Sequence, residues 1–469
     1  MHVRLLIVAA SLAFSGCRDK AASPAKASGP VRLFTDEEIA SYRQGLASRI
    51  DATKARSCPR PVLRGEASPS APPLTAIDAA TGDLGACLDA VKALSKRGKL
   101  TELVAARDPE LVGLADRCGG DVQGLMQASI QRPDACSPFQ IGVGVARDPI
   151  RTTTTAYLLG LRARAAAGTD ASGIWLMLDT IRFTQDLARG SVSLVEPMVA
   201  AASTNTALDT LAALLAQAPP AGDALPPLAA AVDNLLGSTP RIGDALQGET
   251  DSIALHTGAS LLEAPGWIPP GGWPDGLQPS PVVANPDEPD PRDQGALMLA
   301  NAAALAAKLA TACPSTATLK ACHDGLVADA AADDAAAADA DPMAAYADLV
   351  AEALAASNGA ELAATVRAKI RTQLMAAMMA VARPAYGQYV ARYAASVAGL
   401  AALRVHLEVL RVGACPTAAA LAAPPFATLL APDVLGDSLV VRPMADAIEL
   451  APPSWATTKR PPWRIACPR

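Results

Sequence analysis

The sequence predicts an all-α protein: a multi-helix array of antiparallel, alanine- and leucine-rich helices with a small C-terminal β appendage and disulfide cross-links. Three observations predict it. Of 469 residues, 51% are hydrophobic but only 3% aromatic, so the core must be built from alanine, leucine and valine between closely spaced helices. Helical periodicity recurs along most of the chain. Short β-type runs lie near the C-terminus, and nine cysteines are spread along the chain.

Changes in composition divide the chain into segments. An abrupt rise in Pro and Gly after residue 263, with Trp267 and Trp273, indicates a linker or covering loop between two helical regions. The predicted segments are an export signal at 1–17, a flexible tether at 18–34, helical region one at 35–263, the linker or loop at 264–293, helical region two at 294–412, and a segment with short β-strands at 413–469.

In the first helical region, start and stop signals define the helices. Thr35 and Glu38 form a capping box that opens the first helix. Gly119 and Gly120 are expected to separate two helices. The predicted helices lie at 35–50, 75–96, 101–118, 122–131, 150–167, 224–236 and 241–263, together with a central pair between 174 and 217.

The central pair is the part around which we expect the body to be built. Residues 174–189 are apolar around so much of the helical circumference that a helix here is buried on several sides. Gly190 supplies its left-handed stop. The second helix begins either at Ser193, with a capping-box partner at Glu196, or at Pro197 as the first helical residue.

Four charged residues interrupt the first helix of this pair. They fall within about 80° of arc and alternate in sign at i, i+3 and i+4 spacing. We expect a solvated seam with modest ion pairs. The alternative is a polar cleft that binds a ligand. The four candidate residues are Asp179, Arg182, Asp186 and Arg189.

The same kinds of local signal predict the elements of the second helical region and of the C-terminal segment. Pro384 is expected to begin the last long helix, in which His406 takes a surface or hydrogen-bonded core position. No uninterrupted apolar run beyond the export signal is long enough to cross a bilayer. The predicted helices lie at 294–312, 315–329, 342–356, 360–381 and 384–411, and the predicted strands at 438–441, 447–450 and 463–466.

The N-terminus has the features of an exported lipoprotein. A short basic stretch and an apolar run precede Ser15, Gly16 and Cys17. The run LAFSGC at 12–17 resembles the lipobox of bacterial lipoproteins, although Phe14 stands where that family usually has Leu. The resemblance implies cleavage before Cys17, acylation of its sulfur and a lipid anchor at the periplasmic face or the outer membrane. The alternative is a cleaved secretory signal with an incidental cysteine.

The other eight cysteines form an even number in a compartment where thiols oxidise, which predicts disulfides. No pair has the two-residue spacing of a zinc or redox site. Proximity in sequence favours pairing Cys58 with Cys87, Cys118 with Cys136, Cys313 with Cys322, and Cys415 with Cys467.

No local motif indicates catalysis, so we expect no catalytic residue, metal or cofactor. A nucleophile elbow, a His-Glu-x-x-His pair and a phosphate-binding glycine loop are all missing from the sequence. Cys322-His323 resembles the end of a haem-attachment motif, but Cys313 is too far away to complete it.

The favoured function is a non-catalytic cell-envelope lipoprotein that serves as a helical scaffold or binding module. Its expected partners are the bilayer, through acylated Cys17, and an envelope protein. The net charge of −6 and the scarcity of aromatic residues argue against nucleic acid as a partner. The alternatives are an envelope hydrolase with dispersed carboxylates, and a binder of small ligands or divalent ions.

Overall fold

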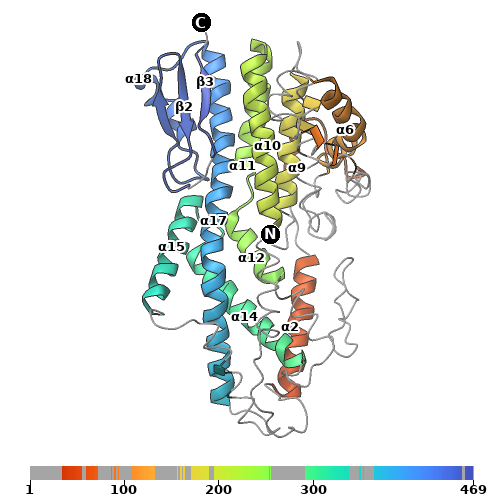
Figure 1. Ribbon diagram of the computed structural model, residues 1–469, viewed down its shortest axis with the longest axis vertical. Coiled ribbons are helices and arrows are strands. Elements are labelled where there is room, and N and C mark those ends of the chain that lie inside the picture. Colours follow the sequence, from red (N-terminus) through yellow and green to blue (C-terminus); the bar gives the residue numbers. More distant parts are fainter. Residues whose placement is uncertain are drawn as a thin grey trace. The chain divides into compact units, whose positions relative to one another are not determined.

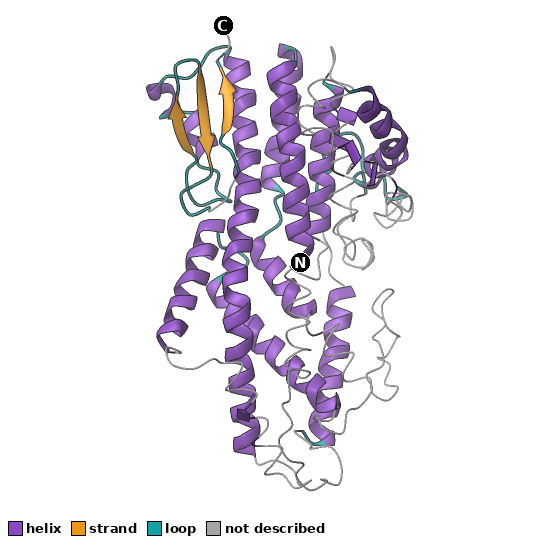
Figure 2. Ribbon diagram, viewed as in Figure 1, coloured by secondary structure: helices purple, strands orange, loops and turns teal. Residues whose placement is uncertain are grey.

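The computed structural model describes most of the helical body and the C-terminal segment. These residues form helices and one small sheet (Figure 2), which confirms the predicted fold class. Cys17, the tether up to residue 33 and residues 264–290 of the linker lie outside the described residues. The structure describes 34–54, 60–71, 108–132, 171–189, 195–252, 291–336, 364–456 and 460–467, with a few short stretches and single positions between them.

The chain divides into two compact units, and each takes segments from both predicted helical regions. The first unit comprises residues 1–55, 246–315 and 324–388. The second comprises residues 56–245, 316–323 and 389–469.

In the first unit, helices α2 (Asp36–Lys54) and α14 (Pro291–Ala312) pack together. The predicted capping box begins α2: Thr35 N donates to Glu38 Oε2 at 2.8 Å, and Glu38 N donates to Thr35 Oγ1 at 3.2 Å. Arg367 Nη1 also donates to Glu38 Oε2, at 3.1 Å. The first turn of α2 is therefore fixed both by its own cap and by a distant arginine.

The second unit contains the predicted central pair as helices α9 (Ser172–Arg189) and α10 (Val195–Gln217). The two pack side by side (Figure 1), and 15 residues of α9 are buried. Helices α6 (Pro109–Ser129) and α11 (Leu225–Gly237) also pack against α9. The other short elements of this unit are η1 (Gly222–Ala224), α18 (Ala418–Leu421) and α19 (Phe426–Leu430), and both units contribute residues to α12 (Ile242–Ser252) and α15 (Leu319–Ala336).

Helix α6 (Pro109–Ser129) is one continuous helix, so the predicted break at Gly119 and Gly120 is wrong. The reason is tertiary. A Cβ atom at position 119 would lie 2.6 Å from Cδ of Arg162, closer than real Cβ atoms approach a neighbour. Glycine is needed here because it lets the Arg162 side chain pack against α6, and the surrounding contacts offset the low helix propensity of glycine.

Helix α17 (Ala364–Val412) runs through Pro384, so the two helices predicted at 360–381 and 384–411 are one. A proline inside a helix costs roughly 3 kcal/mol because it removes a backbone donor and crowds the preceding turn. Nearly every residue between Val390 and Val409 is buried. Burial of this long apolar stretch, together with many alanines, offsets the cost of the proline.

The predicted C-terminal β appendage is confirmed, and its three strands form an antiparallel sheet in the order β1-β2-β3. Its buried side chains alternate along β3, where Trp463 and Ile465 are buried and Arg464 and Ala466 are exposed. This is the period expected of a strand with one covered face. The strands are β1 (Val440–Pro443), β2 (Ala447–Ala451) and β3 (Trp463–Ala466).

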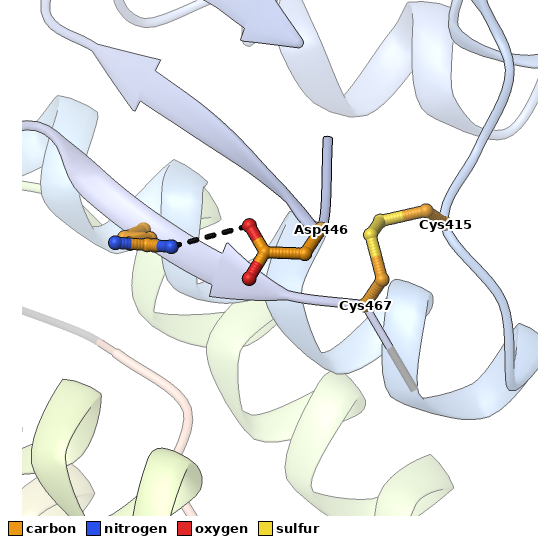
Figure 3. Close-up of a disulfide and its surroundings, with 4 residues drawn as sticks. Cys415, Asp446 and Cys467 are labelled. Atoms are coloured by element: carbon orange, nitrogen blue, oxygen red, sulfur yellow. Dashed lines mark hydrogen bonds and ion pairs between the residues drawn. A yellow bond between two sulfur atoms is a disulfide. The ribbon is translucent and has the colours of Figure 1, made fainter. Parts of the chain in front are cut away.

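A disulfide between Cys415 and Cys467 joins the appendage to the chain just after α17, which confirms that predicted pair (Figure 3). Beside it, Cys467 N donates to the carbonyl oxygen of Asp446 at 2.9 Å. Cys118, Cys313 and Cys322 are also disulfide-bonded. Cys58, Cys87 and Cys136 lie outside the described residues.

Three described helical stretches are long and apolar enough to cross a membrane by length and composition. This differs from the expectation of none beyond the signal. Alanine explains the difference, since it raises the mean hydropathy of a helix even where it faces solvent, as at Ala303 and Ala307 of α14. Of an apolar 18-residue segment within the last stretch, 89% is already buried inside the protein. The stretches are Pro197–Gln217, Gly295–Ala312 and Tyr386–Val412.

Candidate functional site

The charged strip of α9 does not face water, so the predicted solvated seam is wrong. Asp179 is 1% exposed, and Arg182 and Asp186 are 0% exposed. The side chain of Arg189, at the end of the helix, is 15% exposed. The strip is covered because residues 60–71, α6 and α11 all pack on this side of α9 and supply polar partners for it.

Asp186 forms the centre of the buried strip through a two-point ion pair with Arg60. Arg60 Nε donates to Oδ1 at 2.8 Å, and Arg60 Nη2 donates to Oδ2 at 2.6 Å. The same Nη2 donates to the carbonyl oxygen of Ile130 at 2.7 Å, and Arg189 Nη1 donates to Asp186 Oδ1 at 3.1 Å. Arg60 therefore holds its own segment against both α9 and the end of α6.

Asp179, two turns earlier, has a separate set of partners. Arg64 Nη2 donates to its Oδ2 at 2.5 Å, and Gln127 Nε2 of α6 donates to the same atom at 3.1 Å. The Arg64 guanidinium also lies 4.9 Å from the ring centre of Trp175, a cation–π distance. Burial raises the pKa of the Asp179 carboxyl, and Arg64 and Gln127 partly oppose that rise. Through this hydrogen bond, Asp179 holds the half-exposed Arg64 side chain against α9.

Arg182 is the least satisfied charged group of the strip. Its Nη2 donates to Asn234 Oδ1 of α11 at 2.5 Å. Burial lowers the pKa of Arg182 to about 10; Asp186 opposes that effect, and the positive charges of Arg60 and Arg189 add to it. The group is still protonated at neutral pH. Arg182 Nε and Nη1, and Arg189 Nη2, are buried without a hydrogen-bond partner among the described residues.

We call Arg60, Arg182, Asp186 and Arg189 the arginine cluster. It contains three guanidinium groups and one carboxylate. The phenol of Tyr393 lies near enough to Arg189 to affect its pKa. Burial raises the pKa of Tyr393, and its hydroxyl donates to the carbonyl oxygen of Pro240 at 2.7 Å. Tyr393 therefore stays neutral and leaves the excess positive charge of the cluster uncompensated.

The chemistry of the arginine cluster suits an anion better than a metal ion or a general base. Its one carboxylate already accepts three hydrogen bonds from Arg60 and Arg189. Where the structure describes the chain, no three His, Cys, Asp or Glu side chains lie close enough together to hold a metal ion. The surrounding guanidinium groups would repel a divalent cation.

Sequence reasoning found the α9 members of this site but missed the residues that complete it. Arg60 and Asp186 are 126 positions apart, and Arg182 and Asn234 are 52 apart. No periodicity connects residues at such separations. One signal was nevertheless present, because a helix that is apolar on nearly all sides must be covered on nearly all sides. A helix of this kind leaves little room for a solvated charged strip.

A second buried polar contact lies where the appendage meets α17. Trp463 Nε1 donates to His406 Nδ1 at 3.2 Å, and His406 is 5% exposed. Burial lowers the pKa of His406 to about 4. The hydrogen-bonded core position expected for this histidine is therefore confirmed, and the imidazole is neutral at physiological pH.

Acidification is expected to destabilise the protein through His406. Its folded-state pKa of about 4 lies below the unfolded value of about 6.5, so the unfolded chain binds a proton first. The contribution of neutral His406 to the free energy of unfolding is therefore complete above about pH 6.5. It is lost as the pH falls towards 4, which lowers the free energy of unfolding by about 3 kcal/mol in total. Urea unfolding across this pH range measures the effect. The free energy of unfolding of His406→Gln, whose amide can still accept from Trp463, should depend less steeply on pH than that of the wild type.

Trp463→Phe is the matched control for this measurement. It removes the hydrogen-bond donor but keeps the buried imidazole. The free energy of unfolding should therefore be lower at every pH but keep the pH dependence of the wild type. Equal pH slopes in the wild type and His406→Gln would contradict the assignment.

No protein-family model matches this chain, and neither a curated protein nor a solved structure is similar to it.

Proposed function

We propose that this protein is a non-catalytic lipoprotein of the cell envelope whose helical body is a binding module or scaffold. The observation that carries the proposal is the run LAFSGC at residues 12–17, which follows a basic start and an apolar core. Cys17 would carry the acyl chains. At about 0.8 kcal/mol per buried methylene, two or three chains would hold the protein on a bilayer essentially permanently.

The cysteines of the body support an exported location. A disulfide joins Cys415 to Cys467, and three further cysteines are disulfide-bonded. Disulfides persist in oxidising compartments such as the periplasm and are rare in the reducing cytosol. An envelope address accounts for this number of cross-links in one chain.

The surroundings of three buried carboxylates support binding over hydrolysis. A general acid or base must be free to exchange its proton with a substrate. Asp179 and Asp186 accept from arginines instead. Buried Glu408 on α17 accepts from Arg404 and Arg411, and the hydrogen bonds from Arg411 lower its pKa. These three carboxylates act as partners of fixed cations.

The burial of the apolar helices supports an acyl anchor in preference to a spanning helix. Most of the apolar segment of α17 is buried inside the protein, and the stretch includes the charged residues Arg404 and Glu408. The α10 stretch exposes Asp209 and Gln217, and the α14 stretch exposes Lys308. Charged and amide groups at these positions would be costly in hydrocarbon.

The anchor is tested by replacing Cys17 with serine. In a bacterial host grown with radiolabelled palmitate, the wild-type chain should incorporate label and sediment with membranes. Cys17→Ser should incorporate none, because the acceptor sulfur is missing. The matched control is Cys467→Ser, which removes another cysteine and should keep the label. An unlabelled wild-type chain, or equal labelling of Cys17→Ser, would contradict the proposal.

A further inference from the structure

The arginine cluster has more buried positive charge than its single carboxylate can balance. Arg60 and Arg182 are buried with Asp186, and Arg189 is 15% exposed. Among the described residues, the other two charged groups that act on Arg182 are Arg60 and Arg189. Buried charges in proteins are normally paired, because an unpaired ion loses its hydration without compensation. The cluster therefore lacks negative charge.

Two arginines of the cluster also have hydrogen-bond donors without acceptors in the described part of the chain. Arg182 Nε and Nη1 and Arg189 Nη2 are buried, and none has a partner among the residues that the structure describes. Buried donors are nearly always satisfied by protein, water or ligand atoms. Because the free donors belong to the residues that carry the excess charge, one acceptor with negative charge would satisfy both requirements.

We infer that the arginine cluster binds one small oxyanion, a carboxylate or a tetrahedral phosphate or sulfate group, at Arg182 and Arg189. Guanidinium groups form charge-assisted hydrogen bonds with both kinds of oxyanion. This inference specifies the ligand class of the proposed binding module and is independent of the lipid anchor.

Water is the competing occupant, and charge distinguishes the two. A water molecule could accept from Arg182 Nε and could donate to Gln185 Oε1, which is also buried without a partner. It would leave the excess positive charge unchanged. An oxyanion would remove the charge imbalance as well, and the excess positive charge therefore favours it over water.

Arg189 determines where such an ion would enter. It is the last residue of α9 and the most exposed member of the cluster, whereas the side chains of Arg60 and Asp186 are 1% and 0% exposed. An oxyanion would therefore meet Arg189 first and Arg182 deeper in the protein. A divalent cation would meet guanidinium groups along the same route and be repelled.

The test is isothermal titration calorimetry on the full-length protein in detergent micelles at constant ionic strength. Sodium sulfate and sodium acetate are titrated separately, so that tetrahedral and planar oxyanions are distinguished. We expect saturable binding of one ion per chain for at least one of them. Arg182→Met should weaken that binding by about 10- to 100-fold, because charge-assisted hydrogen bonds are lost.

Two further variants keep the test decisive. Arg404→Met is the matched control, since Arg404 is a largely covered arginine of α17, 13% exposed, whose partners are Asp233 and Glu408; it should bind as the wild type does. Arg189→Gln should weaken binding, and it decides the question if Arg182→Met fails to fold by circular dichroism.

The absence of saturable binding of either ion to the wild type would overturn the inference. Unchanged affinity in both Arg182→Met and Arg189→Gln would do the same. Palmitate labelling of Cys17 is unaffected by either result, so failure of the oxyanion site and failure of the lipoprotein proposal can be told apart.

Discussion

Replacing Asp186 with asparagine is expected to lower the free energy of unfolding by about 3–5 kcal/mol, the usual cost of removing one partner from a buried ion pair. Asparagine keeps the shape of the side chain but removes the charge. Arg60, Arg182 and Arg189 would then lie together in the interior with no carboxylate among them. Urea unfolding followed by circular dichroism at neutral pH measures the difference.

Asp233→Asn is the matched control for Asp186→Asn. Asp233 also accepts from an arginine, Arg404 Nε at 2.9 Å, but its side chain is 52% exposed. Water and salt screen such a pair, so its loss should cost less than about 1 kcal/mol. If the two variants lost equal stability, burial would not be what makes the Asp186 pair important.

Replacing both Cys415 and Cys467 with serine is expected to cost about 4 kcal/mol. The bond joins residues 52 positions apart, and closing a loop of that length removes much of the freedom of the unfolded chain. The released segment contains all three strands, so the appendage should be the first part to unfold. Guanidinium unfolding of the oxidised wild type and of the double variant gives the difference.

Two further measurements complete this test. Reductant should abolish the difference in stability between the wild type and the double variant, because it opens the Cys415–Cys467 bond in the wild type and the remaining disulfides in both chains. Asp446→Asn is the local control, since its ion pair with Arg464 beside the disulfide is exposed on both sides (Figure 3) and should contribute little. A double variant as stable as the wild type would show that the bond does not restrain the unfolded chain.

Local patterns predicted the elements well wherever the signal was contained in a few neighbouring residues. The capping box at Thr35 and Glu38 needs only a spacing of three and forms as expected. The three β-type runs differ from the helices around them in period and composition, and they form one sheet. The pairing of Cys415 with Cys467 followed from their proximity in the sequence.

Local signals failed where a distant contact outweighed them. Gly119 and Pro384 are helix breakers by propensity, yet both lie inside continuous helices. Propensity is worth about 1 kcal/mol for glycine and about 3 kcal/mol for proline, and packing of a long buried face contributes more. The charge pattern of α9 failed for the same reason, since Arg60 and Arg64 approach it from more than a hundred residues away.

The sequence by itself determined that this protein is helical, alanine-rich and cross-linked, because composition, periodicity and cysteine spacing act through near neighbours. Only the tertiary structure decided that the charges of α9 are buried and that several arginines surround Asp186. It also decided that two Arg182 nitrogens are buried without a hydrogen-bond partner among the described residues. The physical reason is that the burial of a side chain depends on all the segments that pack around it, and these segments can be distant in the sequence. An isolated helix cannot specify whether its charged side faces water or another part of the chain.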